Sequence, residues 1–528
     1  MGLIAKFSTV GGATLASRVL GFAREALIAS ALGAGPVADA FYAAFRFPNL
    51  FRRLFAEGAF NSAFVPLFAK ELEGGGREAA RRFAEEVLAV LLLVLIAISA
   101  IAMIFMPLLV ETVIASRFDP ASEKFPLTVV MAQVMFPYLT AMSLVAMLSG
   151  VLNSFRRYFL AALAPVLLNV VLIAVLLGAR QAGLEAKAIG MALAWGVVGS
   201  GMLQLGLLVF GVWKEGFPIA LRRPRLTAPV KRLLWLAIPA AITGGITQIN
   251  LLVGQNIASA QDGAIAIMNY ADRLVQLPLG VIGIAIGVVL LPELSRSLKA
   301  GDLADATHLQ NRSLEFGLGL TLPAAMGFII MPEVLVAIVY ERGSFARETT
   351  ELAGVVLAAF AVGLPAFTLI SIFRPGFYAR EDMRTPMWFA GANALTNITG
   401  SLWLFPILGV AGIAISTSIA GWVNAILLGA TLWNRNLFRP SPETFRRLGL
   451  ILLANALLAA GLWVAHGLLQ TLLLDGAVLL RVGLLLAVLL VAMVFYFGFV
   501  VATGAIEGDR LAAMLRKRKA PADANDKP

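Results

Sequence analysis

The chain has 528 residues, of which 59% are hydrophobic and 14% are charged, and its mean hydropathy is +0.86. Soluble domains are about 45–50% apolar and about 25% charged, so a string of soluble domains is excluded and lipid is the expected solvent. The absence of cysteine excludes a disulfide framework and thiolate metal sites, while the net charge of +11 calls for anionic lipid, nucleic acid or an anionic cargo.

Apolar stretches bounded by charged or turn-rich segments predict an all-α polytopic membrane protein with fourteen transmembrane helices. In chain order the predicted helices cover 7–31, 38–69, 86–111, 128–153, 159–180, 187–212, 229–258, 265–294, 310–339, 351–379, 386–405, 409–434, 446–468 and 481–505. The first stretch contains charged residues and no cleavage site, so it is predicted to be a helix of the mature protein rather than a signal peptide.

The basic residues predict the orientation of these helices. With an even number of spans both termini lie on one side, and that side carries 28 Lys and Arg residues against 7 on the other. By the positive-inside rule both termini are cytoplasmic. Topology therefore explains much of the net charge without nucleic acid, and the basic cluster at 516–519 is expected to lie near the headgroups of membrane lipids.

Similar segments recur along the chain at offsets of 221 to 228 residues; Pro66 matches Pro292, and Arg117 matches Arg342. A repeat of six helices keeps both halves in the same orientation, which predicts two six-helix lobes around a central cavity, followed by two further helices. The predicted divisions are an N-terminal lobe at 1–213, a connector at 214–228, a C-terminal lobe at 229–440, two final helices at 441–508 and a basic tail at 509–528.

Seven arginines and four acids fall within the predicted spans, and each arginine at the bilayer centre costs roughly 2.5–3.5 kcal/mol. The arginines are Arg18, Arg24, Arg46, Arg52, Arg53, Arg273 and Arg374, and the acids are Glu25, Asp39, Glu57 and Asp272. The positive excess predicts a water-filled cavity that receives an anion. Guanidinium groups bind phosphate through paired hydrogen bonds, so a pyrophosphate fits this cavity better than a cation does.

Helical spacing predicts how these charges are arranged. Arg18 and Glu25 lie on one stripe of the first helix, whereas Arg24 points about 100° away from Glu25 unless the helix is distorted. In the second helix Asp39, Arg46 and Arg53 share a heptad stripe. Two alternatives stay open here, a structural ion pair between Arg46 and Asp39 and an interfacial position for Arg53.

Several motifs resemble one family over essentially the whole chain. They are Ser17-Arg-Val-Leu-Gly-Phe-Ala-Arg-Glu, Phe47-Pro-Asn-Leu-Phe-Arg-Arg-Leu-Phe-Ala-Glu-Gly-Ala-Phe and Tyr270-Ala-Asp-Arg-Leu. These segments are similar to the MurJ (MviN) lipid II flippases of the MOP exporter superfamily. The resemblance implies a transporter and not an enzyme, which moves lipid II between leaflets during peptidoglycan synthesis and so supports the cell wall and cell shape.

The resemblance also implies a site. Arg18, Arg24, Arg52 and Arg273 match the family's cavity arginines and are expected to hold the pyrophosphate. The expected supporting charges or gate residues are Glu25, Asp39, Arg46, Arg53, Glu57 and Asp272. The last two helices match those that form a groove for the lipid tail.

No metal site and no cofactor are predicted with confidence from these residues, although some relatives bind sodium through acids in the seventh and eleventh helices. Here Asn250, Asn393 and Asn397 stand in the corresponding places, and they define at most a weak sodium site. A further departure is Gln276, where some relatives have Glu. The expected energy source is the membrane potential or an ion gradient.

The expected location is the bacterial inner membrane, in multiple passes, with lipid II and membrane lipids as partners and the cell-wall synthesis machinery as a candidate partner. Two alternative functions stay open: a flippase for another polyprenyl-pyrophosphate-linked oligosaccharide of the O-antigen type, or a MATE-like antiporter. A membrane glycosyltransferase is disfavoured because the outer connections are short and do not pair acids with a metal or base motif.

Overall fold

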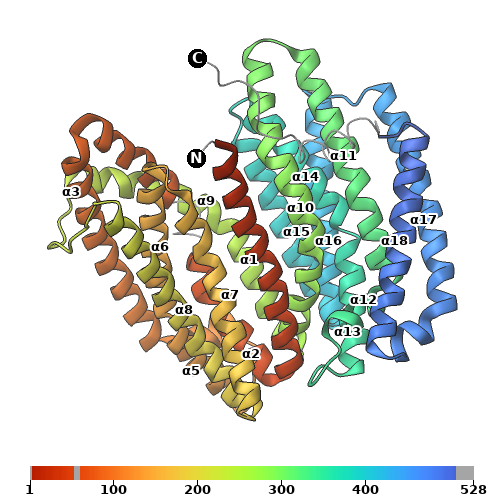
Figure 1. Ribbon diagram of the computed structural model, residues 1–528, viewed down its shortest axis with the longest axis horizontal. Coiled ribbons are helices and arrows are strands. Elements are labelled where there is room, and N and C mark those ends of the chain that lie inside the picture. The colour runs from red at the N-terminus through yellow and green to blue at the C-terminus, as the bar shows by residue number, and fades with distance from the viewer. Residues whose placement is uncertain (1–2, 53–59, 507–528) are drawn as a thin grey trace, which may run out of the picture. The chain divides into compact units, whose positions relative to one another are not determined.

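The computed structural model of the chain describes residues 3–52 and 60–506, and these are almost entirely helical (Figure 1). The predicted all-α class is thereby confirmed, with eighteen α-helices, one short π-helix and no strand in the described ranges. The helices are α1 (Leu3–Leu32), α2 (Pro36–Arg52), α3 (Phe60–Ile104), α4 (Met106–Leu109), the π-helix η2 (Val110–Ile114), α5 (Lys124–Met135), α6 (Pro137–Ser154), α7 (Tyr158–Gln181), α8 (Ala186–Lys214), α9 (Ala228–Ala258), α10 (Ala264–Lys299), α11 (Leu303–Ile330), α12 (Pro332–Tyr340), α13 (Arg347–Ala361), α14 (Leu364–Tyr378), α15 (Arg384–Leu408), α16 (Val410–Asn434), α17 (Pro442–Asp475) and α18 (Val478–Ala502).

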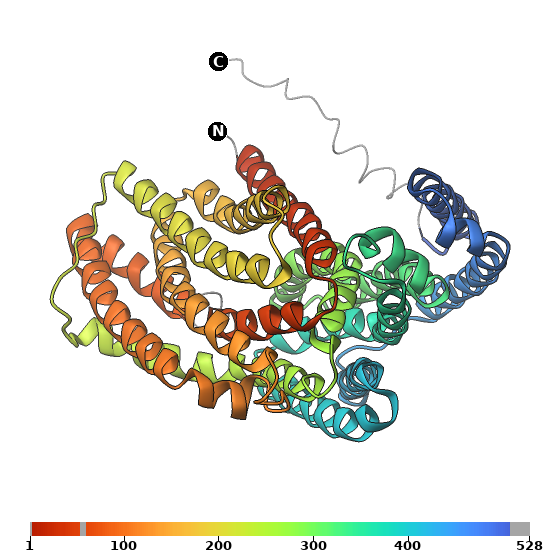
Figure 2. The same cartoon turned by 90° about the horizontal axis from the view of Figure 1, so that it is seen from below.

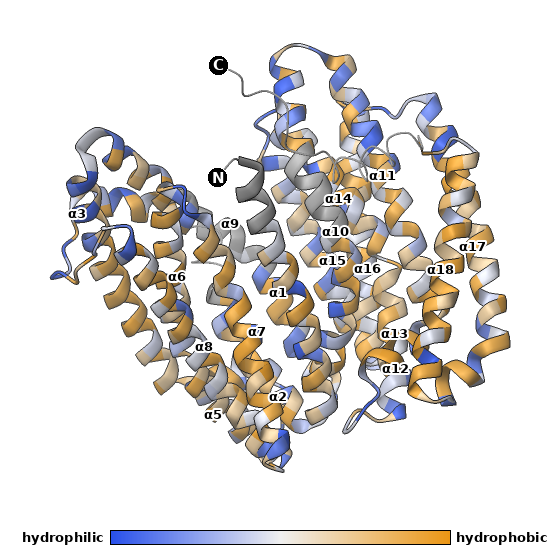
Figure 3. Cartoon of the chain, viewed as in Figure 1, coloured by the Kyte–Doolittle hydropathy of each residue, from blue (hydrophilic) through white to orange (hydrophobic). Residues whose placement is uncertain are grey.

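Nine helical segments within the described ranges are long and apolar enough to cross a membrane, two of them made of the pairs α5–α6 and α13–α14. Apolar residues cover most of the helical surface, and polar residues gather at helix ends and connections (Figure 3). The chain is therefore a multi-pass membrane protein. The larger count of fourteen spans stays a prediction.

Several predicted helices are broken in the structure, and a proline follows each break. The predicted helix 128–153 is divided between α5 and α6, 310–339 between α11 and α12, and 351–379 between α13 and α14. Pro137, Pro332 and Pro365 occupy the first turn of the second piece in these three cases. Proline has no N–H for the preceding turn and is readily accommodated at a helix start, so each proline begins a new helix.

The predicted helix 38–69 is described in two parts, α2 as far as Arg52 and α3 from Phe60. Arg53 and Glu57 fall in the interval 53–59 and lie outside the described residues. Further along α3, Gly76 has φ 74° and ψ −172°, a backbone conformation that glycine adopts without a side-chain clash. This kink separates the end of the second predicted span from the third.

Contacts divide the chain into two compact units. The first contains Met1–Arg273, Val339–Ala353 and Asn397–Ser416. Within it α1 packs against α7, α7 against α8, α2 against α5, and α3 against α6. This division does not test the predicted lobe boundary at 214–228, which stays a prediction.

The second unit contains Leu274–Ile338, Gly354–Thr396 and Thr417–Pro528. Here α11 packs against α14 and α17, and α17 packs against α18, the two dark-blue helices that lie side by side in Figure 2. Polar contacts also link α17 and α18 to α11. The Tyr496 hydroxyl donates to the Gly319 carbonyl at 2.7 Å, and Arg447 pairs with the buried Glu315 at 3.0 Å.

Candidate substrate site

A buried carboxylate in the first unit gathers donors from three helices. Glu25 of α1 is 3% exposed, and its Oε1 accepts hydrogen bonds from Arg24 and, at 3.1 Å, from Arg273 of α10. The Tyr42 hydroxyl of α2 donates to Oε2 at 2.5 Å. Two guanidinium groups thus share one carboxylate, and this small cluster keeps a net positive charge.

Asn169 of α7 fixes the position of Arg24. Arg24 Nη1 donates to Asn169 Oδ1 at 3.0 Å, and Asn169 Nδ2 donates to the Ser17 carbonyl at 2.9 Å. Arg24 is only 7% exposed, yet its Nε makes no hydrogen bond with any described residue. A buried donor without an acceptor is uncommon in a folded protein, so Arg24 Nε is ready to receive an acceptor from a ligand.

The structure corrects the predicted arrangement of charges along the first helix. Arg24 does not point away from Glu25 but bonds to it, because the long arginine side chain spans the 100° between neighbouring positions. Arg18, which the helical stripe placed with Glu25, is exposed and is not among the partners of Glu25. Glu25 therefore pairs with Arg24, its neighbour in sequence, rather than with Arg18, two turns earlier.

The other predicted substrate and supporting residues are placed only in part. Arg52 is the last residue of α2, and its side chain lies outside the described part of the structure. Asp272 is partly buried next to Arg273 on α10. Of the four arginines predicted to hold substrate, the structure brings Arg24 and Arg273 together.

Asp39 forms a second buried cluster in the same unit. It is 0% exposed and accepts hydrogen bonds from Lys124 Nζ at 3.2 Å and from the backbone amides of Gly263 and Ala266 at 2.7 Å and 3.0 Å. Those amides belong to the start of α10, so a carboxylate from α2 caps the positive end of another helix. Lys124 also pairs at 2.7 Å with Asp262, whose side chain is 92% exposed.

Close backbone contacts surround this cap. Gly33, at the end of α1, has φ 60°, and a Cβ there would lie 2.3 Å from the Ser344 carbonyl oxygen. A Cβ on Gly263 would lie 2.5 Å from the Ala34 carbonyl oxygen. The Tyr270 hydroxyl donates to the Gly33 carbonyl at 2.8 Å. Only glycine fits at these two positions, so this end of α1 is tightly held.

The alternative pairing of Arg46 with Asp39 is not what the structure shows, because Asp39 is bonded to Lys124 and two amides. Arg46 instead donates to Asn269 Oδ1 at 3.0 Å. This contact joins α2 to α10 one turn along from the Asp39 cap.

Two of the three asparagines of the predicted weak sodium site are bonded to each other. Asn397 Nδ2 donates to Asn250 Oδ1 at 3.0 Å, and the Ser416 hydroxyl donates to the Asn397 carbonyl at 2.8 Å. Asn393 is partly buried one turn earlier on α15. The weak sodium site stays a prediction.

Tyr42, Asn169 and Lys124 are site residues that the sequence did not single out. Asn169 is a lone amide within the apolar run of α7, which is a usable signal for a polar contact inside the membrane. Lys124 lies just before the predicted helix 128–153, and in the structure it begins α5 and is 7% exposed. Tyr42 carries no signal that distinguishes it from a packing aromatic.

Comparisons with known proteins identify relatives that match nearly the whole chain. The family model of the lipid II flippase MurJ matches residues 28–502. A protein of Rhizobium meliloti (strain 1021), described as a probable lipid II flippase MurJ, is 53% identical over 527 residues, which cover 99% of this chain and 98% of that relative.

Two solved structures share the fold. One is titled lipid II flippase MurJ in an inward closed conformation; it matches with a TM-score of 0.77 at 25% identity and covers 94% of this chain and 98% of its own. The other is an inward-facing MATE family transporter of the MOP superfamily, with a TM-score of 0.68 at 14% identity over 80% of this chain and 94% of its own. With a family match and a close relative that both extend over nearly its whole length, the chain belongs to the MurJ family of lipid II flippases.

Proposed function

We propose that this protein moves lipid II from the cytoplasmic to the periplasmic leaflet of the bacterial inner membrane, with both of its termini in the cytoplasm. The observation that carries the proposal is the cluster of Arg24, Glu25 and Arg273, in which two guanidinium groups share one carboxylate between helices that the sequence predicts to span the membrane. Ionisable residues at such depth are rare because of their cost, and they commonly mark the path of a substrate.

The chemistry of the cluster suits a pyrophosphate. Each guanidinium presents several donors in a fixed plane and binds phosphate oxygens through paired hydrogen bonds. Arg24 offers its unused Nε, and the Arg273 side chain is 35% exposed and therefore accessible to a ligand. Glu25 holds the two groups close together before the substrate arrives, and the phosphates then compete with it for the same donors. Arg18 and Arg52 are the proposed further contacts.

The proposed mechanism is alternating access, with the Asp39 cluster near the start of α2 as the contact that opens. Opening this contact would separate Asp39 from Lys124 and from the first turn of α10. Lys124 would keep Asp262 as a partner, since that side chain is 92% exposed and is already bonded to it. Lys124 thus keeps a counter-charge when this contact opens, which lowers the cost of opening on the lysine side.

The lipid tail is proposed to stay in contact with α17 and α18. Both helices present large apolar side chains to their surroundings, including Leu479, Leu490 and Val491, which are 88%, 63% and 68% exposed. Such a surface is matched to hydrocarbon and would accept a polyprenyl chain while the headgroup occupies the arginine cluster.

The proposal is tested by replacing Arg24 and Arg273 with glutamine in cells depleted of the wild-type protein. The loss of one charged hydrogen-bond donor to substrate is worth about 1.5–3 kcal/mol, which predicts a fall in lipid II flipping of roughly tenfold or more. The measurement is the fraction of lipid II that is accessible from outside the cell. Arg180→Gln, at an exposed position near the end of α7, is the matched control.

Lipid II should accumulate on the cytoplasmic side with Arg273→Gln and not with Arg180→Gln. If Arg24→Gln and Arg273→Gln both sustain normal flipping at normal protein levels, the arginine cluster is not the substrate site. If lipid II distribution is unaffected by complete depletion of the protein, the flippase assignment itself fails.

A further inference from the structure

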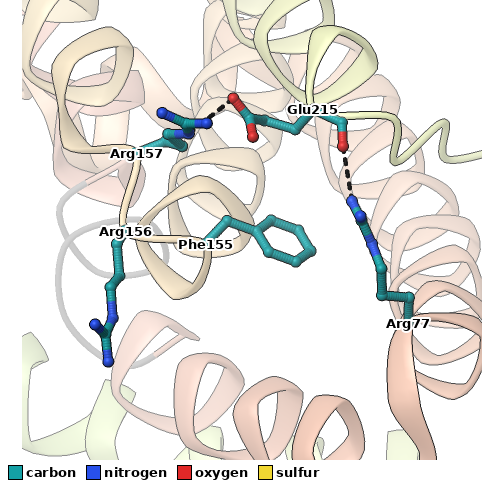
Figure 4. A pocket seen from close by; sticks show the side chains of 5 residues that line it. All are labelled: Arg77, Phe155, Arg156, Arg157 and Glu215. Carbon is teal, nitrogen blue, oxygen red and sulfur yellow. Dashed lines mark hydrogen bonds and ion pairs between the residues drawn. The ribbon is translucent and has the colours of Figure 1, made fainter.

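A cavity in the first unit shares no residue with the arginine cluster. It measures about 460 Å³ and is lined by Arg77, Phe155, Arg156, Arg157 and Glu215 (Figure 4). Arg77 belongs to α3 just after the Gly76 kink, the next three residues form the turn between α6 and α7, and Glu215 follows α8. Three guanidinium groups and one carboxylate give the lining an excess of positive charge.

Glu215 engages two of the three arginines in different ways. Arg157 Nε pairs with its carboxylate at 2.9 Å, whereas Arg77 Nη2 donates to its backbone carbonyl at 2.7 Å. The Arg77 guanidinium also lies over the Phe155 ring, 5.3 Å from the centroid. A carbonyl and an aromatic ring position Arg77 but do not neutralise it, so its full charge is available to an anion.

Arg156 is the most unusual member of the lining. It follows α6 with φ 60°, a left-handed conformation in which glycine is favoured at helix ends. Its side chain is exposed, and it points away from Glu215 (Figure 4). It has no ion pair with the residues described in the structure. A strained position occupied by a charged side chain is typical of a functional contact rather than of packing.

Exposed aromatic residues place the cavity at the level of lipid headgroups. Tyr158 and Phe159 follow the turn directly and are 40% and 50% exposed, and Trp213 near the end of α8 is 65% exposed. Tyrosine and tryptophan concentrate where hydrocarbon meets water. The cavity lies among connections that the charge distribution predicts to be cytoplasmic.

We propose that this cavity binds the phosphate of an anionic phospholipid from the surrounding bilayer. Basic pockets between membrane helices suit such headgroups, and arginine binds a phosphodiester through more than one donor. Arg77, already oriented by Phe155 and Glu215, supplies a fixed donor, and the exposed Arg156 supplies a second one. Glu215 keeps Arg157 in place and repels a second anion. The site does not depend on the proposed transport reaction.

The test uses the full chain, purified with its bound lipid and exchanged into mixed micelles of phosphatidylglycerol and phosphatidylcholine. Native mass spectrometry measures which lipid is retained. The wild-type protein is expected to prefer phosphatidylglycerol, and Arg77→Gln and Arg156→Gly are expected to lower that preference roughly tenfold. Arg180→Gln, at the other end of α7 from the turn, should behave as the wild type.

Arg156→Gly separates binding from folding. Glycine relieves the backbone strain at φ 60°, so the thermal unfolding midpoint of this variant should stay equal to that of the wild type or rise. Weaker lipid retention together with an unchanged or higher midpoint supports the proposal. If Arg77→Gln and Arg156→Gly both retain phosphatidylglycerol as Arg180→Gln does, the proposal is overturned.

A second experiment distinguishes binding of a lipid from binding of a soluble anion in this cavity. Inorganic phosphate at millimolar concentration is added to the wild-type protein and to Arg156→Gly. We expect it to leave phosphatidylglycerol retention unchanged, because the aromatic residues place the cavity against the bilayer. If inorganic phosphate displaces the lipid from the wild-type protein, the cavity is a site for soluble anions and the phospholipid assignment is wrong.

Discussion

Glu25 accepts hydrogen bonds from side chains of α1, α2 and α10, and each of these donors is held by a second contact or by burial. An arginine alone in this environment would be very costly, and two together would also repel each other. The carboxylate offsets both effects while leaving the cluster positive. Protein stability therefore depends on the side chain that also holds the two proposed substrate-binding arginines.

Replacement of Glu25 with glutamine should destabilise the protein. The variant leaves Arg24 buried beside Arg273 without a counter-charge, and breaking a buried ion pair from one side costs about 3–5 kcal/mol. The measurement is the unfolding midpoint of the purified protein in detergent. Glu351→Gln is the control, because Glu351 is 59% exposed and its pair with Arg347 is 3.7 Å long.

The control variant should lose less than about 1 kcal/mol, as exposed ion pairs do. If Glu25→Gln unfolds at the same midpoint as Glu351→Gln, the two arginines are neutralised by other groups and Glu25 is not their main partner.

At the scale of elements, the helix starts are determined by prolines and by capping side chains. Pro137, Pro332 and Pro365 begin new helices, whereas Pro165 lies inside the uninterrupted α7. At the start of α15, Asp382 Oδ1 accepts from the Thr385 amide at 3.0 Å. Its other carboxylate oxygen accepts from the Thr385 hydroxyl at 2.7 Å and pairs at 3.0 Å with Arg435, which directly follows α16.

These contacts make the start of α15 sensitive to acid. The hydrogen bonds from Thr385, together with Arg435, hold the pKa of Asp382 below its usual range. The lowered pKa means that the stabilisation is complete above about pH 4, the ordinary aspartate value, and is lost as the pH falls through the lower pKa of the folded state. Amide exchange in the first turn of α15 should therefore accelerate below about pH 4.

Asp382→Asn provides the comparison for this measurement. Without a titrating carboxylate, exchange in the first turn of α15 should be faster than in the wild type at neutral pH and should show no further acceleration specific to this turn in acid, after correction for intrinsic exchange rates. An identical pH profile in both proteins would assign the acid sensitivity to another group.

At the scale of the whole molecule, polar site residues are concentrated on a few helices. Arg24, Asp39, Asn250, Arg273 and Asn397 lie on α1, α2, α9, α10 and α15. α7 and α18 contain stretches with mean hydropathies of 2.8 and 2.9 and supply surface for lipid.

The energy source can be tested at this scale. Asn250 and Asn397 are bonded to each other, so we expect transport to be independent of sodium. A negative-inside potential favours outward movement of an anionic headgroup by about 2.3 kcal/mol per charge per 100 mV. In cells or vesicles, replacing sodium with choline should leave lipid II flipping unchanged, and collapsing the potential should slow it. Loss of flipping in choline with the potential intact would contradict this expectation.

The sequence by itself determined the all-α class, the positions of most helices to within a few residues, the family, and the presence of charge within the membrane, because hydropathy and charge are local properties of a segment. Arg24 and Arg273 could be predicted as site residues from the sequence for the same reason, since each is a charge within an apolar segment. It did not determine where proline breaks a helix, since Pro165 and Pro137 look alike in an apolar run.

Only the tertiary structure decided which charges meet. Asp39 is bonded to Lys124 and to the amide of Gly263, and Arg24 to Asn169, through contacts between residues more than eighty positions apart. Helical periodicity gives the direction of a side chain on its own helix but not the neighbour that the packing brings to it. The partner of a buried charge depends on which helices pack together, and for that reason the arrangement of the site follows from the fold and not from spacing.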